Sequence, residues 1–290
     1  MCKRVTTISI VADVNTPIQR FPDPGRLTRM AYEWVSFTTD YGLGDGFVAA
    51  CHGVIARIAP AVRVIDVSHQ VPAQQVRHGA AVLAQTVAHL PPSVHLAVVD
   101  PGVGTTRRGI VVTARDGLLV GPDNGLLLPA AEQLGGVLAV HELDTSRAAS
   151  ATFHGRDVFA PAAARLALGE APAGPRIDDP VELPPPHVHE EPGLLEAEIR
   201  TVDGFGNVQL AARATELRGA VTVHCGPVSL RARTGRTFAD VEPGEAVLLT
   251  DSAGYLAVAV NGGSAAEALN VGSTRLITVR SGHGTDHPAR

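Results

Sequence analysis

The sequence predicts an α/β protein in two parts: an N-terminal α/β domain with a largely parallel central sheet, and a smaller C-terminal domain that is β-rich and barrel-like. Up to about residue 170, short apolar runs alternate with stretches of helical periodicity, which is the pattern of βαβ units. Seven prolines then crowd into residues 172–192, which favours an extended linker and excludes a sheet interior. After residue 193, short β-rich runs alternate with glycine-containing turns, as expected for a small, mostly antiparallel β domain or barrel.

The order of apolar runs and turn formers also predicts the individual elements and their grouping. The expected elements are strands at 35–39, 62–67 and 94–99, helices at 48–58 and 76–90, a strand, turn and helix within 117–128, and a helix that ends at Gly169. The expected divisions are an N-terminal extension at 1–33, an α/β domain at 34–170, a proline-rich linker at 171–192 and a β-rich domain at 193–290.

Composition argues against several classes of protein. The chain has 290 residues, is 45% hydrophobic, carries a formal net charge of −5 and has Lys3 as its only lysine, so it lacks the clustered positive charge that nucleic acids require. No run approaches the roughly 18 apolar residues of a membrane helix. The cysteines Cys2, Cys51 and Cys225 form no CxxC pair, which argues against a zinc ribbon or a disulfide framework and favours a cytoplasmic location.

Three aspartates, Asp40, Asp66 and Asp100, lie at or near the carboxyl ends of expected strands. Open α/β sheets bind their ligands beyond these ends, so the three side chains are candidates for a site. Aspartate also caps helices and begins turns, and each residue taken alone fits that structural role equally well. A metal held by these carboxylates is a weaker alternative.

Familiar catalytic and phosphate-binding motifs are missing. The P-loop pattern and its lysine are absent, "DYGLGDGF" at 40–47 does not fit GxGxxG, and no GxSxG elbow exists for a serine hydrolase. The twelve histidines show no HExxH spacing, and "HVH" at 187–189 falls in the proline-rich segment. The sequence therefore predicts neither a nucleotide-phosphate loop nor a bound catalytic metal.

Polar residues in glycine-supported turns remain as candidates. Asp100 and Arg107 share the loop "VVDPGVGTTRRG" at 98–109, and His154 lies in "TFHGRD". A salt bridge that braces the loop and a structural histidine are the plain alternatives. In the second domain, "VDGFGN" at 202–207 is either a turn with a stray aromatic or an exposed stacking face beside a carboxylate and an amide, which would suit a purine and a cation.

Seven motifs together resemble one family, the S-adenosyl-L-methionine (SAM) hydrolases, also called SAM hydroxide adenosyltransferases, which are relatives of the fluorinases and chlorinases. The likeness runs from about Trp34 to Val279. The motifs are "FTTDYGLGDGFV" (37–48), "VIDVSHQVP" (64–72), "VVDPGVGTTR" (98–107), "VGPDNG" (120–125), "TFHGRDVFAPAAA" (152–164), "VDGFGN" (202–207) and "AVNGGSAAE" (259–267).

The resemblance implies an enzyme that cleaves SAM at the ribose C5′ carbon and gives adenosine and L-methionine. The family's catalytic trio maps onto Asp100, Arg107 and His154. Arg107 would stabilise a hydroxide, His154 would hold or accept its proton, and Asp100 would orient Arg107. No metal and no organic cofactor are implied. The family's trimers place each site between the α/β domain of one subunit and the β domain of its neighbour.

The resemblance also implies roles in substrate binding. Asp40 would hold the ribose hydroxyls, and Asp203, with Ser252 nearby, would meet the methionyl ammonium. The adenine would be held by Phe205 and Phe238 on its faces, by Asn207 at its edge, and by the backbone around Asn261 and Gly262.

Departures from the halogenase pattern favour water as the nucleophile. Halogenases carry aromatic residues in place of Asp100 and His154, and the fluorinase has a halide-binding serine where this chain has Gly155. Gln74 replaces a tryptophan of the halogenase pocket, and Ala253 replaces an arginine that binds the substrate carboxylate, which leaves that carboxylate without an assigned partner. The alternatives are a SAM halogenase, a non-catalytic SAM or adenosine sensor, and a metal-dependent phosphoesterase.

Overall fold

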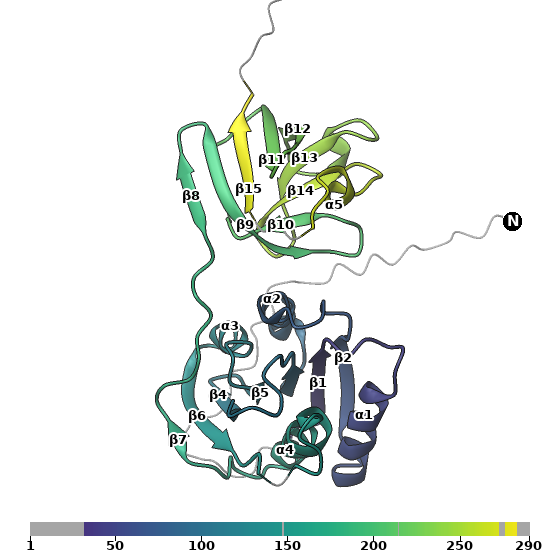
Figure 1. Cartoon of the computed structure of the whole chain (residues 1–290), viewed down its shortest axis with the longest axis vertical. Coiled ribbons are helices and arrows are strands. Elements are labelled where there is room, and N and C mark those ends of the chain that lie inside the picture. The colour runs from purple at the N-terminus through teal and green to yellow at the C-terminus, as the bar shows by residue number, and fades with distance from the viewer. Residues whose placement is uncertain (1–31, 147, 214, 273–275, 283–290) are drawn as a thin grey trace, which may run out of the picture.

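The computed structural model describes residues 32–146, 148–213, 215–272 and 276–282. Apart from Tyr32 and Glu33, the extension expected at 1–33 lies outside the described residues. An α/β domain and a β-barrel domain follow one another along the long axis of the molecule (Figure 1). One extended linker segment joins them.

The N-terminal domain is built on a seven-stranded mixed sheet in the order β2-β1-β3-β5-β4-β6-β7. Strands β2, β1, β3 and β5 pair in parallel, whereas β4 pairs antiparallel with β5 and β6, and β7 antiparallel with β6. The predicted α/β domain is confirmed, and its sheet is mixed because β4 and β5 form a hairpin. The strands are β1 (Trp34–Thr39), β2 (Arg63–Ser68), β3 (Ser93–Val98), β4 (Gly109–Ala114), β5 (Gly117–Pro122), β6 (Val137–Leu143) and β7 (Arg176–Ile177).

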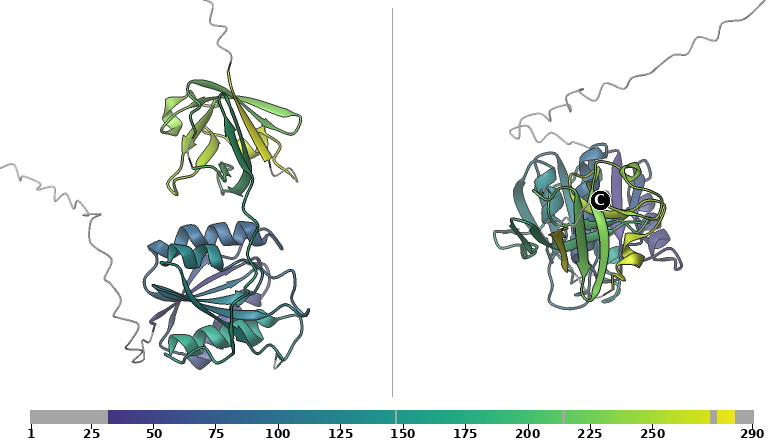
Figure 2. Two further views of the ribbon diagram at one scale, coloured as in Figure 1. Left: turned by 90° about the vertical axis from the view of Figure 1, so that its left-hand side faces the viewer. Right: turned by 90° about the horizontal axis from the view of Figure 1, so that it is seen from above.

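Two pairs of helices cover the two faces of this sheet (Figure 2). Because side chains alternate across a strand, Leu96 of β3 packs toward α1 and α4, and its neighbour Ala97 packs toward α2 and α3. Apolar side chains at helical spacing on α1, among them Cys51 and Ile55, are fully buried against the sheet. The helices are α1 (Phe47–Ile58), α2 (Val76–Thr86) with a 3₁₀ turn at Val87–His89, α3 (Leu128–Gln133) and α4 (Ala160–Ala167), the last preceded by one π-helical turn at Gly155–Phe159.

The C-terminal domain is a closed barrel, as predicted. Its strands run in the order β10-β14-β13-β12-β11-β15-β9, and β10 also pairs with β9, which closes the ring. Its interior is apolar, with Leu195, Val208, Val223 and Val258 fully buried. The elements are β8 (Val188–Glu191), β9 (Leu194–Val202), β10 (Val208–Leu210), β11 (Ala220–Cys225), β12 (Val228–Thr234), β13 (Ala246–Thr250), β14 (Leu256–Val260), β15 (Leu276–Ser281), a 3₁₀ turn (Phe238–Asp240) and the short helix α5 (Ala265–Ala268).

The proline-rich segment contributes only edge strands. β7 ends the first sheet beside β6, and β8 flanks β9 outside the ring of the barrel. The "LPPP" run at 183–186 lies between them and has no regular structure. The prolines of this segment therefore stay out of the interior of both sheets, where each would remove a ladder hydrogen bond.

Helix α2 lies on the side of the N-terminal domain that faces the barrel (Figure 1). Its Gln85 donates from Nε2 to Gln209 Oε1 on β10 at 2.6 Å, and its Arg77 lies 4.0 Å from Glu198 on β9. In the part of the chain that the structure describes, no helix combines the length and apolar character needed to cross a membrane.

Candidate active site

The loop after β3 folds back on itself and brings Arg107 beside Asp100. Two successive turns form it: Val103 N donates to the Asp100 carbonyl at 3.3 Å, and Thr105 N donates to the Gly102 carbonyl at 3.2 Å. Gly104 has φ +78°, and a Cβ there would lie 2.9 Å from the Ala151 carbonyl oxygen. Only glycine fits at this position, because both the backbone conformation and the neighbouring backbone exclude a side chain.

Asp100, Arg107 and His154 form one buried, hydrogen-bonded cluster. Arg107 donates from Nε to Asp100 Oδ1 at 3.1 Å and from Nη2 to Asp100 Oδ2 at 2.5 Å, a bidentate pair. Arg107 Nη2 also lies 3.1 Å from His154 Nδ1. The side chains of Arg107 and Asp100 are 9% and 6% exposed, and His154 is 6% exposed. The three residues named from the sequence thus lie together, although 47 positions separate Arg107 from His154.

The environment of the cluster fixes the protonation of His154. A guanidinium only donates, so Nδ1 must accept the hydrogen bond from Arg107, and in the neutral ring the hydrogen is on Nε2. Burial lowers the pKa of His154, Arg107 lowers it further, and Asp100 and Asp157 oppose them without reversing the direction. Burial also raises the pKa of the Asp100 carboxyl, against the opposing effect of Arg107.

Aromatic side chains enclose the cluster. The Arg107 guanidinium lies 5.3 Å from the centre of the Phe159 ring, which is itself fully buried. Tyr41 packs edge-on against Phe153, with ring centres 5.8 Å apart. A Cβ at Gly155 would overlap the Tyr41 hydroxyl, so the glycine allows this ring to approach the turn that carries His154.

The other two strand-end aspartates have different partners. Asp40 accepts a hydrogen bond at Oδ2 from the backbone nitrogen of Gln74 at 2.8 Å, and Gln74 has φ +64°, an uncommon conformation for this residue type. Asp66 contacts His52 and His69 on the α1 side of the sheet. The structure therefore places Asp100 in the trio and does not join Asp66 to it.

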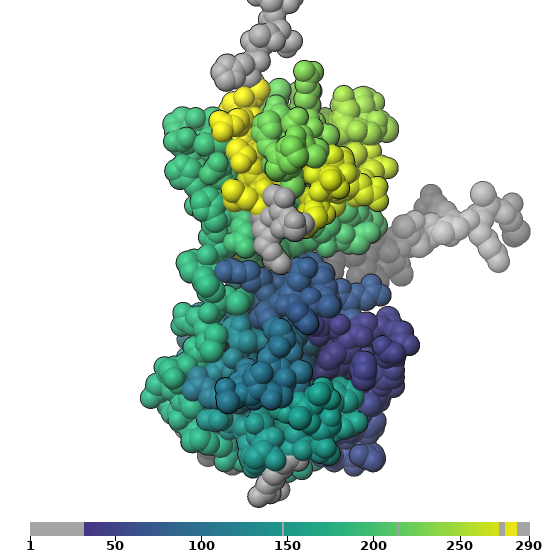
Figure 3. Space-filling model, in the orientation of Figure 1, coloured from purple at the N-terminus to yellow at the C-terminus, as the bar shows by residue number. Residues whose placement is uncertain are grey.

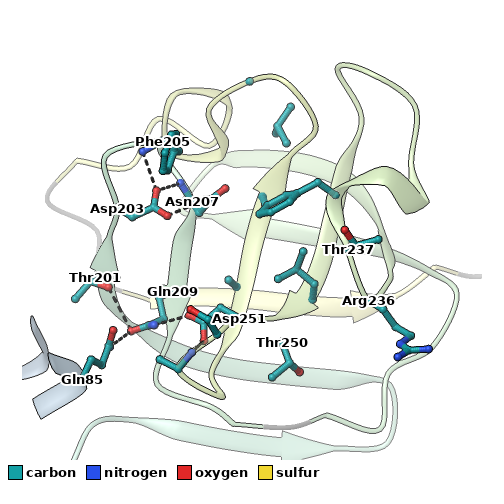
Figure 4. A pocket seen from close by; sticks show the side chains of 18 of the residues that line it. Gln85, Thr201, Asp203, Phe205, Asn207, Gln209, Arg236, Thr237, Thr250 and Asp251 are labelled. Atoms are coloured by element: carbon teal, nitrogen blue, oxygen red, sulfur yellow. Dashed lines mark hydrogen bonds between the residues drawn. The ribbon is translucent and has the colours of Figure 1, made fainter. Parts of the chain in front are cut away.

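A second candidate region is a cavity of about 940 Å³ in the barrel. Seven residues singled out from the sequence line it: Asp203, Phe205, Asn207, Phe238, Ser252, Ala253 and Gly262. Figure 4 shows Phe205 and Asn207 near its rim. Phe205 is 82% exposed and Phe238 is 45% exposed, which is unusual for phenylalanine and leaves their faces free for stacking. Asn261 does not line the cavity, since its Nδ2 donates to the Val241 carbonyl at 2.8 Å.

The turn from Asp203 to Asn207 is held by a single carboxylate. Asp203 Oδ1 accepts from the backbone nitrogens of Phe205 and Asn207, both at 2.9 Å, and Oδ2 accepts from Asn207 Nδ2 at 2.8 Å. Among the described residues these bonds, drawn in Figure 4, leave Asn207 Oδ1 without a donor and one lone pair of Asp203 Oδ2 unused. The turn therefore presents two oxygen acceptors beside an exposed ring.

Sequence reasoning missed the polar floor of this cavity. Gln209 accepts at Oε1 from Gln85 and from Thr201, and donates from Nε2 to Asp251 Oδ2 at 2.5 Å (Figure 4). Asp251 could have been noticed because it precedes Ser252. Gln85 gives no such signal, because it belongs to α2 of the other domain and reaches the barrel only through domain packing.

The trio and the barrel cavity are separate within one chain. Over the described residues, every hydrogen bond and ring contact of the trio stays inside the N-terminal domain. The chain therefore combines an α/β domain that carries a buried Asp-Arg-His cluster with a barrel domain that carries a cavity rimmed by aromatic side chains.

Two family models match this chain, the SAM hydroxide adenosyltransferase N-terminal domain over residues 35–174 and the corresponding C-terminal domain over residues 197–278. The chain belongs to the SAM hydroxide adenosyltransferase family.

Individual relatives agree with this assignment. An (R)-S-adenosyl-L-methionine hydrolase of Salinispora arenicola is 60% identical over 251 residues, which cover 82% of this chain and 94% of the relative. A fluorinase of an Actinoplanes species is 25% identical, over 84% of this chain and 96% of the relative. The crystal structure of an uncharacterized conserved protein from Thermotoga maritima matches with a TM-score of 0.77 at 36% identity, over 84% of this chain and 99% of that one.

Proposed function

We propose that this protein hydrolyses SAM at the ribose C5′ carbon and releases adenosine and L-methionine. The observation that carries the proposal is the buried cluster in which Arg107 is bonded to both Asp100 and His154. The relative from Salinispora arenicola, which is named as an (R)-SAM hydrolase and is 60% identical, supports the same activity.

The reaction needs a nucleophile more than it needs an acid. The sulfonium of SAM leaves as a neutral thioether, whereas water at neutral pH is a poor nucleophile and must gain hydroxide character. A water positioned in line with the C5′–S bond would attack C5′, the C5′–S bond would break with its electrons going to sulfur, and one proton would leave to solvent. The protein therefore has to aim a water and stabilise its negative charge.

The hydrogen-bond pattern of the trio suits that task. Four of the five N–H groups of Arg107 are used by Asp100, His154 and the Arg108 carbonyl, which leaves one Nη1 hydrogen. His154 keeps its Nε2 hydrogen. These two donors would hold the developing hydroxide, and Asp100 would keep the guanidinium in position. In this arrangement His154 stabilises the nucleophile as a donor, since Arg107 already occupies the nitrogen that could accept a proton.

The barrel cavity would bind the rest of the substrate. Adenine would lie between Phe205 and Phe238 with its amino group toward Asn207 Oδ1, and the methionyl ammonium would meet Asp203 near Ser252. Asp40, whose Oδ1 is not used by Gln74, would accept from the ribose hydroxyls. The backbone at Gly262, next to Asn261, would close the adenine side.

We further propose a homotrimer in which the barrel of one subunit supplies the cavity and the α/β domain of its neighbour supplies the trio. Two observations support this arrangement. The trio and the cavity lie in different domains of one chain, and Phe205 presents almost its whole ring to the outside of the barrel.

A halogenase is less compatible with the geometry. A serine at position 155, where the fluorinase binds halide, would place its Cβ on the Tyr41 hydroxyl, so Tyr41 would have to move before a halide site could form. The buried charge of Arg107 is also already paired with Asp100, which leaves it less able to hold an anion such as chloride.

Product analysis tests the proposal and separates it from the alternatives. The protein is incubated with SAM, chloride and EDTA at 25 °C, and the products are separated by chromatography. Adenosine and methionine in equal amounts are expected. A 5′-chloro product would identify a halogenase, adenosine binding without turnover would identify a sensor, and loss of turnover with EDTA would show that a bound metal takes part in the reaction.

A further inference from the structure

A cluster of two histidines and one carboxylate lies away from the trio, at the carboxyl end of β2. It consists of Asp66 on β2, His69 three residues later and His52 on α1. One candidate ligand atom from each residue, two imidazole nitrogens and one carboxylate oxygen, lies within 4.8 Å of the others. Sequence spacing did not predict this cluster, because helix–sheet packing brings His52 to the other two.

The contacts within the cluster converge on one oxygen atom. Asp66 Oδ1 lies 2.8 Å from His52 Nε2 and 2.9 Å from His69 Nε2. Partial burial raises the pKa of Asp66, but His69 and His52 outweigh it and hold the pKa of this carboxyl below its usual range. One carboxylate oxygen thus faces an imidazole nitrogen from each of the two histidines.

His69 is buried, and one of its ring nitrogens is fixed by a hydrogen bond, as is usual for a histidine that binds a metal. Its side chain is 3% exposed, and its Nδ1 lies 2.8 Å from Thr39 Oγ1 on β1, which fixes the plane of the ring. Metal-bound histidines characteristically use their second nitrogen in such a bond, which leaves the first free for the ion. Thr39 Oγ1 also accepts from the backbone nitrogen of Tyr41 at 3.2 Å, so it is a ready acceptor for an Nδ1 hydrogen.

His69 Nε2 is unsatisfied as the side chains stand. Among the described residues it has no hydrogen bond of acceptable geometry, although it is buried and lies 2.9 Å from Asp66 Oδ1. If the ring hydrogen is on Nδ1, Nε2 is an acceptor with no donor and lies 2.9 Å from an oxygen that is itself only an acceptor. If it is on Nε2, the N–H does not point at the oxygen. A buried polar atom in either state costs free energy unless a further partner is present.

We propose that His52 Nε2, Asp66 Oδ1 and His69 Nε2 bind a divalent transition-metal ion of the Zn²⁺ class. Two imidazoles and one carboxylate match the three protein ligands of a four-coordinate zinc site, with water in the fourth position. Water can reach the ion because the side chains of His52 and Asp66 are 34% and 46% exposed. Zinc bonds of about 2.0–2.1 Å require the ligand atoms to adjust slightly, which these two partly exposed side chains permit.

The ligand set selects against the hard cations. Mg²⁺ and Ca²⁺ prefer shells composed of oxygen atoms, whereas two imidazole nitrogens favour Zn²⁺ and its neighbours in the Irving–Williams order.

The ion would stabilise the edge of the sheet without entering the reaction. It would join α1 to β2, and the His69 carbonyl accepts from Gly42 N at 2.7 Å in the loop that follows Asp40. No ligand of the cluster contacts Asp100, Arg107 or His154 in the described residues. We therefore expect EDTA to lower the melting temperature while turnover persists at 25 °C.

Metal titration of the full chain tests the proposal. Protein stripped with EDTA and desalted is titrated with ZnCl₂ by calorimetry and with CoCl₂ by visible absorption, and MgCl₂ serves as the negative control. We expect one Zn²⁺ per chain, the visible bands of four-coordinate Co²⁺ and a higher melting temperature with Zn²⁺. The variants His52→Gln and Asp66→Asn should each weaken binding by at least about tenfold, and Thr39→Val should weaken it less.

A matched control uses histidines outside the cluster. His187 and His189 have side chains that are 53% and 54% exposed, and their joint replacement by glutamine should leave zinc affinity unchanged. The proposal is wrong if stripped protein binds no Zn²⁺, or if His52→Gln, whose folding is checked by thermal melting, binds it as tightly as the parent chain. Loss of binding in the His187 and His189 variant alone would equally overturn it.

Discussion

At the scale of single residues, the state of His154 decides how the trio can act. Because Arg107 donates to Nδ1, the neutral ring presents only the Nε2 hydrogen to a bound water. In our proposal the trio therefore stabilises hydroxide with two donors, and the proton that the water loses goes to solvent. The sequence-based expectation that His154 holds or accepts the proton remains a prediction, and the two roles can be separated by experiment.

Two substitutions at position 154 test whether His154 acts as a hydrogen-bond donor or as a general base. His154→Ala removes the donor, and we expect kcat to fall about 10²–10³-fold with a smaller change in KM. His154→Gln supplies an amide that can accept from Arg107 and donate to water, so it should retain more of the activity. Steady-state kinetics of both variants check this. If the glutamine variant is as inactive as the alanine variant although it folds normally, His154 acts as a base.

The pH dependence follows from the same histidine. Burial and Arg107 lower the pKa of His154, so the ring is neutral at pH 7 and becomes protonated only at a pH below about 6.5. Protonation puts a hydrogen on Nδ1 opposite Arg107 and breaks the cluster. The stability that this group contributes is present above the unfolded-state pKa and is lost as the pH falls through the folded-state pKa.

We therefore expect kcat to decline on acidification with a midpoint below about pH 6.5. The decline should be absent or shifted in His154→Gln, which has no titrating group at this position. The measurement is kcat against pH for both proteins at saturating SAM. An identical acidic limb in both would assign it to another group, with Asp100 the nearest.

At the scale of elements, the turn from Asp203 to Asn207 is the part of the barrel cavity that depends most on local backbone geometry. Gly206 has φ +82°, and a Cβ there would overlap the Ser264 hydroxyl. Gly204 has open space around its Cα and no positive φ. Substitution of these two glycines in the same turn therefore provides a test variant at position 206 and a matched control variant at position 204.

We predict that Gly206→Ala distorts the turn, lowers the free energy of unfolding by about 1–3 kcal/mol and raises the KM for SAM more than it lowers kcat. Gly204→Ala is the control and should change both quantities little. Denaturant unfolding and steady-state kinetics measure the two effects. Equal behaviour of the two variants would show that the turn does not position the substrate.

Much of the element order could be predicted from the sequence, and so could the short-range parts of both regions. Asp100 and Arg107 share one glycine-rich loop, and Phe205 and Asn207 share one turn, so local chemistry already indicates them. His154 was a candidate because of its own glycine-supported turn, but only the family resemblance grouped it with Arg107, because no local rule places the two side by side. Gln85 and the pairing of His52 with Asp66 could not be predicted, since both depend on packing between elements far apart in sequence.

At the scale of the whole molecule, the separation of trio and cavity is the main feature. The chain forms two stacked domains, and the space-filling view shows the barrel resting on α2 of the α/β domain (Figure 3). Gln85 and Arg77 of that helix hold the barrel in place through Gln209 and Glu198. A complete site therefore requires a second chain in our proposal, which gives symmetric assembly a direct role in catalysis.

Mixing two inactive variants tests this assembly. His154→Ala lacks the trio and Asp203→Ala lacks the cavity, so each alone should be nearly inactive. When they are co-expressed in equal amounts, we expect roughly a quarter of the sites to combine one intact trio with one intact cavity and to recover activity in proportion. If each site lies within one chain, every site in the mixture carries one defect and no activity returns.

In our proposal the Asp100–Arg107–His154 cluster delivers a water oxygen to C5′ of SAM. Turnover in ¹⁸O-labelled water, followed by mass spectrometry of the adenosine, tests whether water is the nucleophile. We expect the label on the 5′ oxygen of adenosine and no label in methionine. Adenosine without label at that oxygen would contradict the proposal, because the nucleophile would then not be water.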